Sequence, residues 1–465
     1  MIRMYDTRRQ AVVDFTPIQS GRIGMYVCGP TVQAQPHIGH LRSALVYDLW
    51  RRWFTHRDYK VTFIRNVTDI DDKVLDRADD EPWWALAYRT QLQFADAYAR
   101  INVIPPTFEP HTSASIPQIL ELIDELLRSG NAYVADDASG DVYFDVTSWP
   151  EYGVLSRQRL ESLAPSPDIE TRGKRDPRDF ALWKGRKATE PDSASWTTPW
   201  GGGRPGWHIQ CSAMASHYLG DSFDIHGGGQ DLRFPHHENE LAQSRAAGHA
   251  FASQWIHNGL VDSDGQKMSR SLDNSVDAEA LFNQWRPSAI RYYLASAQYR
   301  SPLDYHEDAI AEADAALTRV EAFLRRSETA ESKGTTEVRM QTPAEFEAAM
   351  DNDLNVPQAL AVLHDFVRTG NAAMDDEDAD EAARKRRGVV AMLEVLGIPF
   401  ETPRSAQQLH SQDRERGLQI ERMLHDRAIA RQIGDYAASD RIRDELGAAG
   451  VRVEDSPTGS RWSIM

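Results

Sequence analysis

The sequence has few cysteines, no long apolar run and no export signal. Cys28 and Cys211 are the only cysteines among 465 residues. Two thiolates held for a metal in a reducing compartment are a better prediction than one disulfide in so large a chain. Nowhere do about eighteen apolar residues run together, so no segment is expected to span a bilayer. The charged start Met1–Arg9 leads into no apolar core, so a cytoplasmic protein without membrane contact is predicted.

Positive charge is also scarce. Lys and Arg total 52 against 70 Asp and Glu, which gives a net charge of −18. Phosphate attraction supplies the sequence-independent part of nucleic-acid affinity, so this balance argues against indiscriminate binding. Specific RNA binding through local Arg-rich faces stays open. The composition, 41% hydrophobic and 26% charged, is ordinary for a globular protein, and the length suggests about three or four domains.

The first third of the chain alternates between strand and helix patterns. Gly24–Gly29 is a short apolar strand, and Ser43–Phe54 carries apolar residues at helical spacing. Lys60–Val67 returns to a strand pattern. Strand, helix and strand with short links predict a parallel βαβ unit, the building block of a nucleotide-binding sheet.

An insertion is predicted to interrupt this sheet domain. Trp83–Gly130 has a helical pattern, and the following stretch to Pro199, rich in Pro, Asp and Ser, is predicted to be irregular. Asp224–His226 and Ile256–Val261 are strand-like and are expected to resume the sheet.

The C-terminal part has mainly helical patterns. Asp308–Arg326 is an amphipathic helix, and the polar stretch Ser327–Thr336 behind it is typical of a linker. Ala344–Leu396 is expected to be helical throughout, and it contains an acidic block, Asp375–Glu381, beside a basic block, Arg384–Arg387. These blocks favour a solvated helix face with internal ion pairing.

Two histidines mark the start of the predicted first helix. His37 and His40 are three residues apart and share a face of its first turn, where unpaired N–H groups and the positive dipole end favour phosphate. Gly39 would let a ligand approach the backbone closely. Taken alone, two histidines near a helix start are more often incidental. The chain has no Walker-type phosphate loop, so an ATP site must be of another kind.

A cationic motif, Lys267-Met-Ser-Arg-Ser271, follows the turn signal Asp264-Gly265. Its two cations, Lys267 and Arg270, and its two hydroxyls would form a compact phosphate clamp on a mobile loop. Such a clamp could stabilise charge on a leaving pyrophosphate. Standing alone, the motif would be interpreted as an exposed polar loop.

Four further side chains have the chemistry of a zinc site. His236 and Glu240 are four residues apart and therefore on one helix face, whereas Cys28 and Cys211 must be joined by folding. Two thiolates, an imidazole and a carboxylate suit Zn²⁺. Spacing alone leaves buried free cysteines as the alternative.

Together, the histidine and lysine motifs resemble the paired signatures of class I aminoacyl-tRNA synthetases. His37-Ile-Gly-His40 matches the first signature fully, and the second departs only at Arg270, where lysine is usual. Arginine keeps the positive charge and can form bidentate hydrogen bonds with phosphate oxygens, so altered geometry rather than lost activity is expected.

Four other motifs resemble those of the cysteinyl-tRNA synthetase family, in order. They are Tyr26–Thr31, Trp207–Cys211, His226–Asp231 and Phe234–Glu240. The resemblance implies one zinc ion per chain, bound by Cys28, Cys211, His236 and Glu240 and joined by the thiolate of the substrate. A metal prefers a thiolate strongly over a serine hydroxyl, so such a site could select cysteine.

The resemblance also implies roles for other residues. The cysteine pocket would contain Gly29, Thr31, Thr68 and Trp207. The ATP site would contain His37, His40, His226, Gly227, Gly228, Gly229, Asp231, Lys267 and Arg270. The catalytic residues would be His37, His40, Lys267 and Arg270, acting by positioning and charge stabilisation. Looser similarity in the tail places anticodon contacts at Arg431, Tyr436, Asp440 and Asp455, each of which could equally be a routine surface residue.

The predicted fold is α/β: a Rossmann-like class I synthetase catalytic domain with an insertion, an all-α bundle and a small C-terminal α+β domain. The expected units are 1–95 and 201–265 for the two catalytic halves, 96–200 for the insertion, 266–330 for the signature loop and stem-contact region, 331–401 for the bundle and 402–465 for the anticodon-binding domain. The resemblance implies a ligase with tRNA(Cys), L-cysteine and ATP with Mg²⁺ as partners, and a monomer is expected.

Two alternatives remain at this stage. A related ligase that joins activated cysteine to an amino sugar would share the catalytic half but would not need the long region 344–465. A non-catalytic relative that binds tRNA or nucleotide is opposed by the intact His37, His40, Lys267 and the four metal positions.

Overall fold

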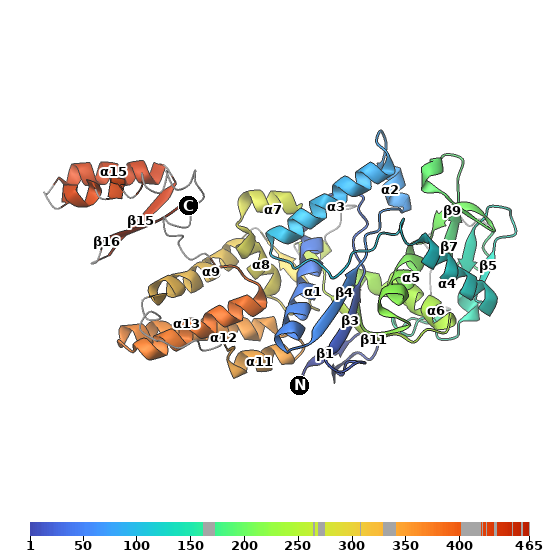
Figure 1. Cartoon of the computed structure of the whole chain (residues 1–465), viewed down its shortest axis with the longest axis horizontal. Coiled ribbons are helices and arrows are strands. Elements are labelled where there is room, and N and C mark those ends of the chain that lie inside the picture. The colour runs from blue at the N-terminus through green and yellow to red at the C-terminus, as the bar shows by residue number, and fades with distance from the viewer. Residues whose placement is uncertain are drawn as a thin grey trace.

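A four-stranded parallel sheet forms the centre of the protein (Figure 1). The computed structural model describes residues 1–160, 173–263, 266–267, 275–306, 308–328, 341–400, 420, 422–424, 426–431, 435–448, 450–456 and 459–464. The sheet order is β11 (Phe251–Asn258), β10 (Ser222–Gly229), β3 (Arg22–Val27) and β4 (Lys60–Arg65). The predicted parallel βαβ unit is confirmed, because α1 (Ile38–His56) connects β3 to its parallel neighbour β4.

The strand order reverses between β3 and β10. The chain leaves β3 for β4 in one direction and leaves β10 for β11 in the other. In open parallel sheets this switch point creates a crevice beyond the carboxyl ends of the strands, where ligands bind. The topology therefore locates the site before any side chain is considered.

Side chains of alternating strand positions bury the two faces of the sheet against different helices. Met25 and Val27 belong to the core on the α1 side, with Trp50 and Trp53. Tyr26 faces the opposite core, to which α5 (Trp207–Leu219) contributes. Figure 1 shows α1 on one side of the sheet and α5 with α6 (Glu238–Ala246) on the other. An N-terminal hairpin, β1 (Arg3–Asp6) and β2 (Ala11–Asp14), was not predicted.

The insertion is more ordered than predicted. Helices α2 (Asp72–Arg77), α3 (Trp83–Arg100) and α4 (Ile116–Ser129) precede a five-stranded antiparallel sheet. Its order is β5 (Ala132–Val134), β6 (Val142–Phe144), β7 (Phe180–Gly185), β9 (Gly201–Pro205) and β8 (Trp196–Thr198), with short 3₁₀ turns at Val146–Ser148 and Asp192–Ala194. The prediction that this stretch is irregular was wrong. Its strands are only three to six residues long and are separated by long polar turns, so they give little periodic signal in the sequence. The expected boundaries at 95 and 200 fall inside α3 and next to β9.

The C-terminal half is largely as predicted. It contains the small sheet of β12 (Val261–Ser263), β13 (Gln266–Lys267) and β14 (Leu303–Tyr305), and the helices α7 (Ala278–Gln284), α8 (Pro287–Ala295), α9 (Ala309–Arg326), α11 (Ala344–Asp351), α12 (Val356–Asp375) and α13 (Ala379–Leu396). The last unit is α+β, with α15 (Tyr436–Ala448) and the hairpin β15 (Val451–Ser456) and β16 (Gly459–Ile464). In the part of the chain that is described, each helix is too short or too polar to cross a bilayer.

The basic block of α13 is only partly solvated. Arg384 pairs with Glu381 on the surface, as the sequence predicted. Arg386 is buried, and its Nη1 donates to the carbonyl of Leu324 at 2.6 Å. Lys385 is also buried and lies over the ring of Phe366. The interpretation of the whole block as a solvated face was therefore wrong, because half of it joins α13 to its neighbours.

A buried arginine, Arg291, joins the catalytic domain to the helical bundle. Arg291 Nη2 donates to Asp48 Oδ2 at 2.6 Å, and both side chains are fully buried. Arg291 also donates to the carbonyl oxygens of Leu396 and Ile101. One guanidinium thus connects α8 to α1, to the end of α3 and to the end of α13.

Arg291→Ala is expected to lower the free energy of unfolding by about 3–5 kcal/mol. It leaves Arg52 as the only cation on the buried Asp48 carboxylate and removes the donor to the carbonyl oxygens of Leu396 and Ile101. Urea unfolding followed by circular dichroism measures the change. Arg368→Ala provides the matched control, since the Arg368–Asp365 pair is 74% and 53% exposed and should contribute about 0–1 kcal/mol. Equal effects of the two variants would contradict the structural role of Arg291.

Candidate active site

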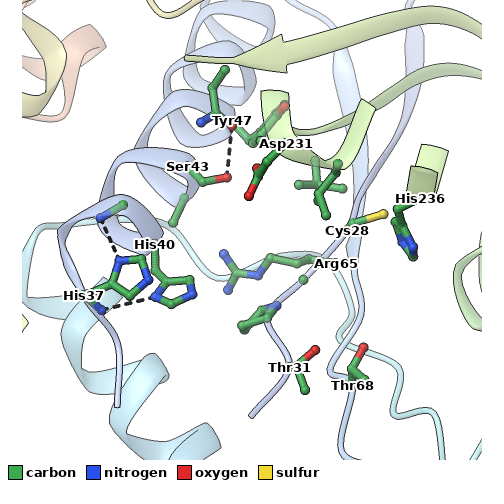
Figure 2. Close-up of a pocket in the computed structure, with 18 of the residues that line it drawn as sticks. Cys28, Thr31, His37, His40, Ser43, Tyr47, Arg65, Thr68, Asp231 and His236 are labelled. Carbon is green, nitrogen blue, oxygen red and sulfur yellow. Dashed lines mark hydrogen bonds between the residues drawn. The ribbon is translucent and has the colours of Figure 1, made fainter. Parts of the chain in front are cut away.

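A cavity of about 400 Å³ opens at the switch point of the central sheet. It lies at the carboxyl ends of β3 and β10 and next to the start of α1, and Figure 2 shows the side chains that converge on it. The predicted site residues that line it are Cys28, Gly29, Thr31, His37, His40, Thr68, Trp207, Cys211, Gly229, Asp231 and His236. The structure therefore brings residues from both halves of the catalytic domain into one pocket.

The two signature histidines cap the first helix. His37 is the N-cap of α1, and its Nδ1 accepts from the backbone N–H of Gly39 at 3.1 Å. His40 Nδ1 accepts from the backbone N–H of His37 at 3.2 Å, which completes a reciprocal capping box built from imidazoles. A neutral imidazole that accepts at Nδ1 carries its proton on Nε2. Both rings are thus positioned at the helix start as hydrogen-bond donors for an anion.

Four potential metal ligands meet at one end of the cavity, which Cys28, Cys211 and His236 line and from which the fully buried Glu240 is set back. One donor atom each from Cys28, Cys211, His236 and Glu240 lies within 4.8 Å of all the others. The Cys28 thiol donates to Glu240 Oε1 at 3.3 Å, and His236 Nε2 lies 3.1 Å from the same oxygen. The residues come from the end of β3, from α5, from the π-helical turn Arg233–His237 and from α6. A second combination, Cys28 with His226, His237 and Glu240, shares two of these residues.

Outer partners favour the first combination. His226 Nε2 is 2.8 Å from Glu240 Oε2, and His237 Nδ1 is 2.7 Å from His257 Nε2. Neither of these two imidazoles lines the cavity, whereas Cys211 and His236 do. His236 Nδ1 lies 3.0 Å from His208 Nδ1, which leaves Nε2 of His236 facing Glu240. Partners of this kind orient metal ligands.

Burial sets the charge of these groups. Desolvation raises the pKa of the Cys28 thiol well above its usual value and also raises that of Cys211. Desolvation lowers the pKa of His236 to about 3, so its imidazole is neutral and offers a lone pair. A bound cation would instead favour the deprotonated form of both thiols, because a metal binds the thiolate and releases its proton.

The residues predicted for the cysteine pocket all line the cavity beside this cluster. Only glycine fits at position 29, because the backbone of Asn66 approaches it closely and a Cβ there would lie 1.7 Å from the carbonyl oxygen of Asn66. Thr31 forms a parallel bridge with Thr68, whose side chain is buried. The Trp207 ring stacks on His236 with centroids 4.3 Å apart. Trp207 is thus a wall of the pocket rather than a core residue.

Three residues predicted for the ATP site do not line the cavity. His226 is fully buried behind Glu240. A Cβ on Gly227 would lie 2.3 Å from the Tyr47 ring, and a Cβ on Gly228 would lie 2.8 Å from His237. The first two glycines therefore permit packing of protein side chains, and their contact with nucleotide stays a prediction. Gly229 and Asp231 do reach the cavity.

The remaining predicted residues lie outside the cavity or outside the described residues. Lys267 is described only as part of the backbone of β13, and Arg270 is outside the described residues. Tyr436 and Asp440 are exposed one turn apart on α15, and Arg431 is exposed before it. Asp455 lies in β15.

The structure also adds pocket residues that sequence reasoning missed. Arg65, at the end of β4, is buried, pairs with Glu109 at 2.8 Å and lies over the Tyr98 ring. Lys73 lies 6.0 Å above the Trp207 ring. Ser43 donates to Asn258 Oδ1 at 3.1 Å. The available signal was the position of Arg65, a cation at the carboxyl end of a strand predicted to be part of a parallel sheet.

Comparisons with known proteins agree with this geometry. Residues 14–315 match the family model described as tRNA synthetases class I (C) catalytic domain, residues 345–401 match the DALR domain and residues 414–462 match the cysteinyl-tRNA ligase anticodon binding domain. Methionyl-tRNA synthetase of Mycobacterium tuberculosis, solved with methionyl-adenylate, has a similar fold, with a TM-score of 0.58 at 16% identity over 81% of this chain and 89% of that chain. A LeuRS–tRNA–LeuAMS complex from Agrobacterium radiobacter gives a TM-score of 0.60 at 12% identity, over 83% and 85% of the two chains.

Fold and site thus define a class I aminoacyl-tRNA synthetase. Cysteine–tRNA ligase of Leifsonia xyli subsp. xyli is 57% identical over 100% of this chain and 99% of its own length. The enzyme of the same name from Clavibacter michiganensis is 55% identical, again over 100% of this chain and 99% of its own. The chain belongs to the cysteine–tRNA ligase family.

Proposed function

We propose that this enzyme ligates cysteine to tRNA(Cys) at the expense of ATP, with a zinc ion at Cys28, Cys211, His236 and Glu240 that selects the substrate thiolate. Family membership supports the reaction. The observation that carries the zinc proposal is the convergence of four donor atoms within 4.8 Å of one another. Three of their residues, Cys28, Cys211 and His236, line the cavity that the signature histidines also line.

The residues present fit a zinc ion. The donor set is two sulfurs, one imidazole nitrogen and one carboxylate oxygen, which are the ligands that Zn²⁺ prefers. Cys211, His236 and Glu240 are at most 2% exposed, and Glu240 and His236 each have an outer hydrogen-bond partner. Bound zinc would supply a Lewis acid that holds a thiolate far more tightly than a serine hydroxyl.

The chain's own residues account for the chemistry of activation. The cysteine carboxylate attacks the α-phosphate of ATP, the bond to the β-phosphate oxygen breaks, and pyrophosphate leaves with Mg²⁺. His37 and His40 donate to phosphate oxygens at the helix start, where the dipole also favours negative charge. Gly229 and Asp231 bound the nucleotide side of the cavity, and Lys267 and Arg270 are proposed to hold the leaving pyrophosphate.

The second step transfers the aminoacyl group. A hydroxyl of the terminal ribose of tRNA attacks the carbonyl carbon of the adenylate, and AMP leaves. No covalent enzyme intermediate is needed, so positioning dominates. We propose that translation in the cytoplasm uses the product, and the expected monomer stays a prediction.

Zinc-replete aminoacylation of total tRNA with labelled cysteine and ATP tests the function. Charging of one tRNA species with cysteine, and not with serine, is the expected result. Cysteine-dependent release of pyrophosphate without any charged tRNA would instead favour the small-molecule ligase.

The C-terminal unit is proposed to read the anticodon through Arg431, Tyr436, Asp440 and Asp455. Tyr436 is 67% exposed at the start of α15, where its ring could stack on a base. Tyr436→Ala is expected to raise the KM for tRNA about tenfold, because base stacking contributes roughly 1–3 kcal/mol, and to leave pyrophosphate exchange unchanged. Tyr218→Ala, 37% exposed on α5, is the control. An unchanged KM for tRNA in the Tyr436 variant would contradict the assignment.

A further inference from the structure

One buried cation of the cavity wall has no role in the chemistry described so far. Arg65 lies at the carboxyl end of β4 and is 6% exposed, and it lines the active-site cavity. Figure 2 shows its guanidinium pointing into the cavity, between His40 and Cys28. A charge is costly to bury unless it is paired, so this position favours an anionic ligand.

The guanidinium is held on one edge and on one face. Nε and Nη2 both donate to Glu109 Oε1, at 3.1 and 2.8 Å. The guanidinium carbon lies 4.5 Å from the centroid of the Tyr98 ring. The backbone N–H of Arg65 donates to the carbonyl of Phe108 at 3.3 Å, so the segment that carries Glu109 is fixed beside β4. The cation is therefore oriented before any substrate binds.

The other edge of the guanidinium is open. Nη1 makes no hydrogen bond with the residues that the structure describes, since both bonds to Glu109 use Nε and Nη2. Nη1 and the second N–H of Nη2 form a planar pair of donors that matches the two oxygens of a carboxylate. Glu109 is 33% exposed, so solvent screens part of its charge. A second carboxylate can thus bind without displacing the first.

On one side, Arg65 adjoins the proposed metal ligands. In the register of the parallel strands it lies opposite Val27, which directly precedes Cys28. A Cβ on Gly29 would lie 3.2 Å from Cγ of Arg65. The carboxylate of cysteine is separated from its sulfur only by Cα and Cβ. A thiolate bound at the metal cluster therefore keeps its carboxylate close to this part of the wall.

On the other side, Arg65 is linked by packed rings to the phosphate end of the cavity. The Tyr98 ring packs edge-on against Phe94 with centroids 5.8 Å apart. Phe94 packs edge-on against His40 with centroids 4.9 Å apart. Arg65 thus lies between the expected positions of the thiolate and of the α-phosphate, where the attacking carboxylate belongs.

The other fully charged wall residues are less suited to this role. Lys73 is exposed, and its ammonium lies 6.0 Å from the centroid of the Trp207 ring. Asp231 is itself an acid and repels a carboxylate. Arg65 is the buried and oriented cation among the three.

We propose that Arg65 binds the α-carboxylate of cysteine and orients it toward the α-phosphate of ATP. The proposal rests on the proposed function, which places the thiolate at the metal cluster and the phosphates at the signature histidines. Contacts at the thiolate and at the carboxylate hold the amino acid at two points, so that one carboxylate oxygen faces the phosphorus atom.

Cysteamine, which is cysteine without its carboxylate, provides the test in the zinc-loaded enzyme. Calorimetric titration without ATP measures the dissociation constants of cysteine and of cysteamine. Wild-type enzyme should bind cysteine at least about tenfold more tightly, because hydrogen bonds between charged groups contribute about that factor. Arg65→Gln should bind the two ligands alike, through a loss of affinity for cysteine alone. Lys73→Gln is the matched control, a second cation of the same cavity, and should keep the wild-type ratio.

Several results would overturn the proposal. A purely structural role of Arg65 would weaken cysteine and cysteamine by the same factor in Arg65→Gln. A wild-type ratio in that variant with a raised KM for ATP would assign Arg65 to the phosphate, and loss of the ratio in Lys73→Gln would assign the carboxylate to Lys73. Equal binding of both ligands by wild-type enzyme would exclude the contact even if Arg65→Gln failed to fold. Wild-type enzyme without cysteine-dependent pyrophosphate exchange would instead overturn the proposed function.

Discussion

Cys211→Ala is expected to abolish zinc binding and cysteine activation together. The thiol is 2% exposed on α5 and converges with Cys28, His236 and Glu240. Alanine leaves only three donors and a cavity where the sulfur was. Loss of an outer partner of a metal ligand already costs about 10–100-fold, so loss of a ligand should lower cysteine-dependent pyrophosphate exchange more than about a thousandfold. Metal analysis should find about one zinc per wild-type chain and almost none in the variant.

ATP binding should survive the same substitution, because the histidines of the α1 capping box do not depend on the cluster. Calorimetric titration with a non-hydrolysable ATP analogue measures this. Ser212→Ala is the matched control: the neighbouring Oγ is buried but donates to Gln243 at 2.7 Å. That variant should retain its zinc and its activity. Full selectivity for cysteine over serine in zinc-free enzyme would contradict the zinc proposal.

His37→Asn and His37→Ala are expected to lose activation equally but to differ in stability. Both remove the imidazole donor from the start of α1, and loss of one oriented donor to a developing charge lowers the rate about 10²–10³-fold. Only alanine also removes the N-cap acceptor for Gly39, which should cost about 1 kcal/mol. Pyrophosphate exchange and thermal unfolding measure the two effects separately.

Asparagine is thus an internal control for the structural role of His37, because it is among the best N-cap residues. Wild-type exchange by the asparagine variant would show that the imidazole only caps the helix. Equal instability of the two variants would show that the capping bond to Gly39 contributes nothing.

Much of the regular structure could be predicted, and the misses have physical causes. The helical pattern of Ala344–Leu396 and the strands around α1 were correct, because long periodic segments carry their own signal. The antiparallel sheet of the insertion was missed because its strands are short and each is defined by its neighbours. The nucleotide contact of Gly227–Gly229 stays a prediction, and the sequence could not show that Tyr47 and His237 occupy the space beside its first two glycines.

The sequence by itself determined what depends on spacing along one element. His37 and His40 share the first turn of α1, and His236 and Glu240 lie four residues apart, so their proximity follows from helix pitch. Their resemblance to family motifs indicated the class of enzyme. Nothing in that spacing could show which distant residues would meet them.

Only the tertiary structure decided the rest. It brings Cys28, which follows β3, against Cys211 of α5, because both side chains pack in the core on the α5 face of the sheet. It places His226 behind Glu240 rather than in the cavity, and it puts Arg65 into the pocket wall. These contacts depend on which side chains are buried against which, and that is settled by packing across the whole domain rather than by neighbours in the chain.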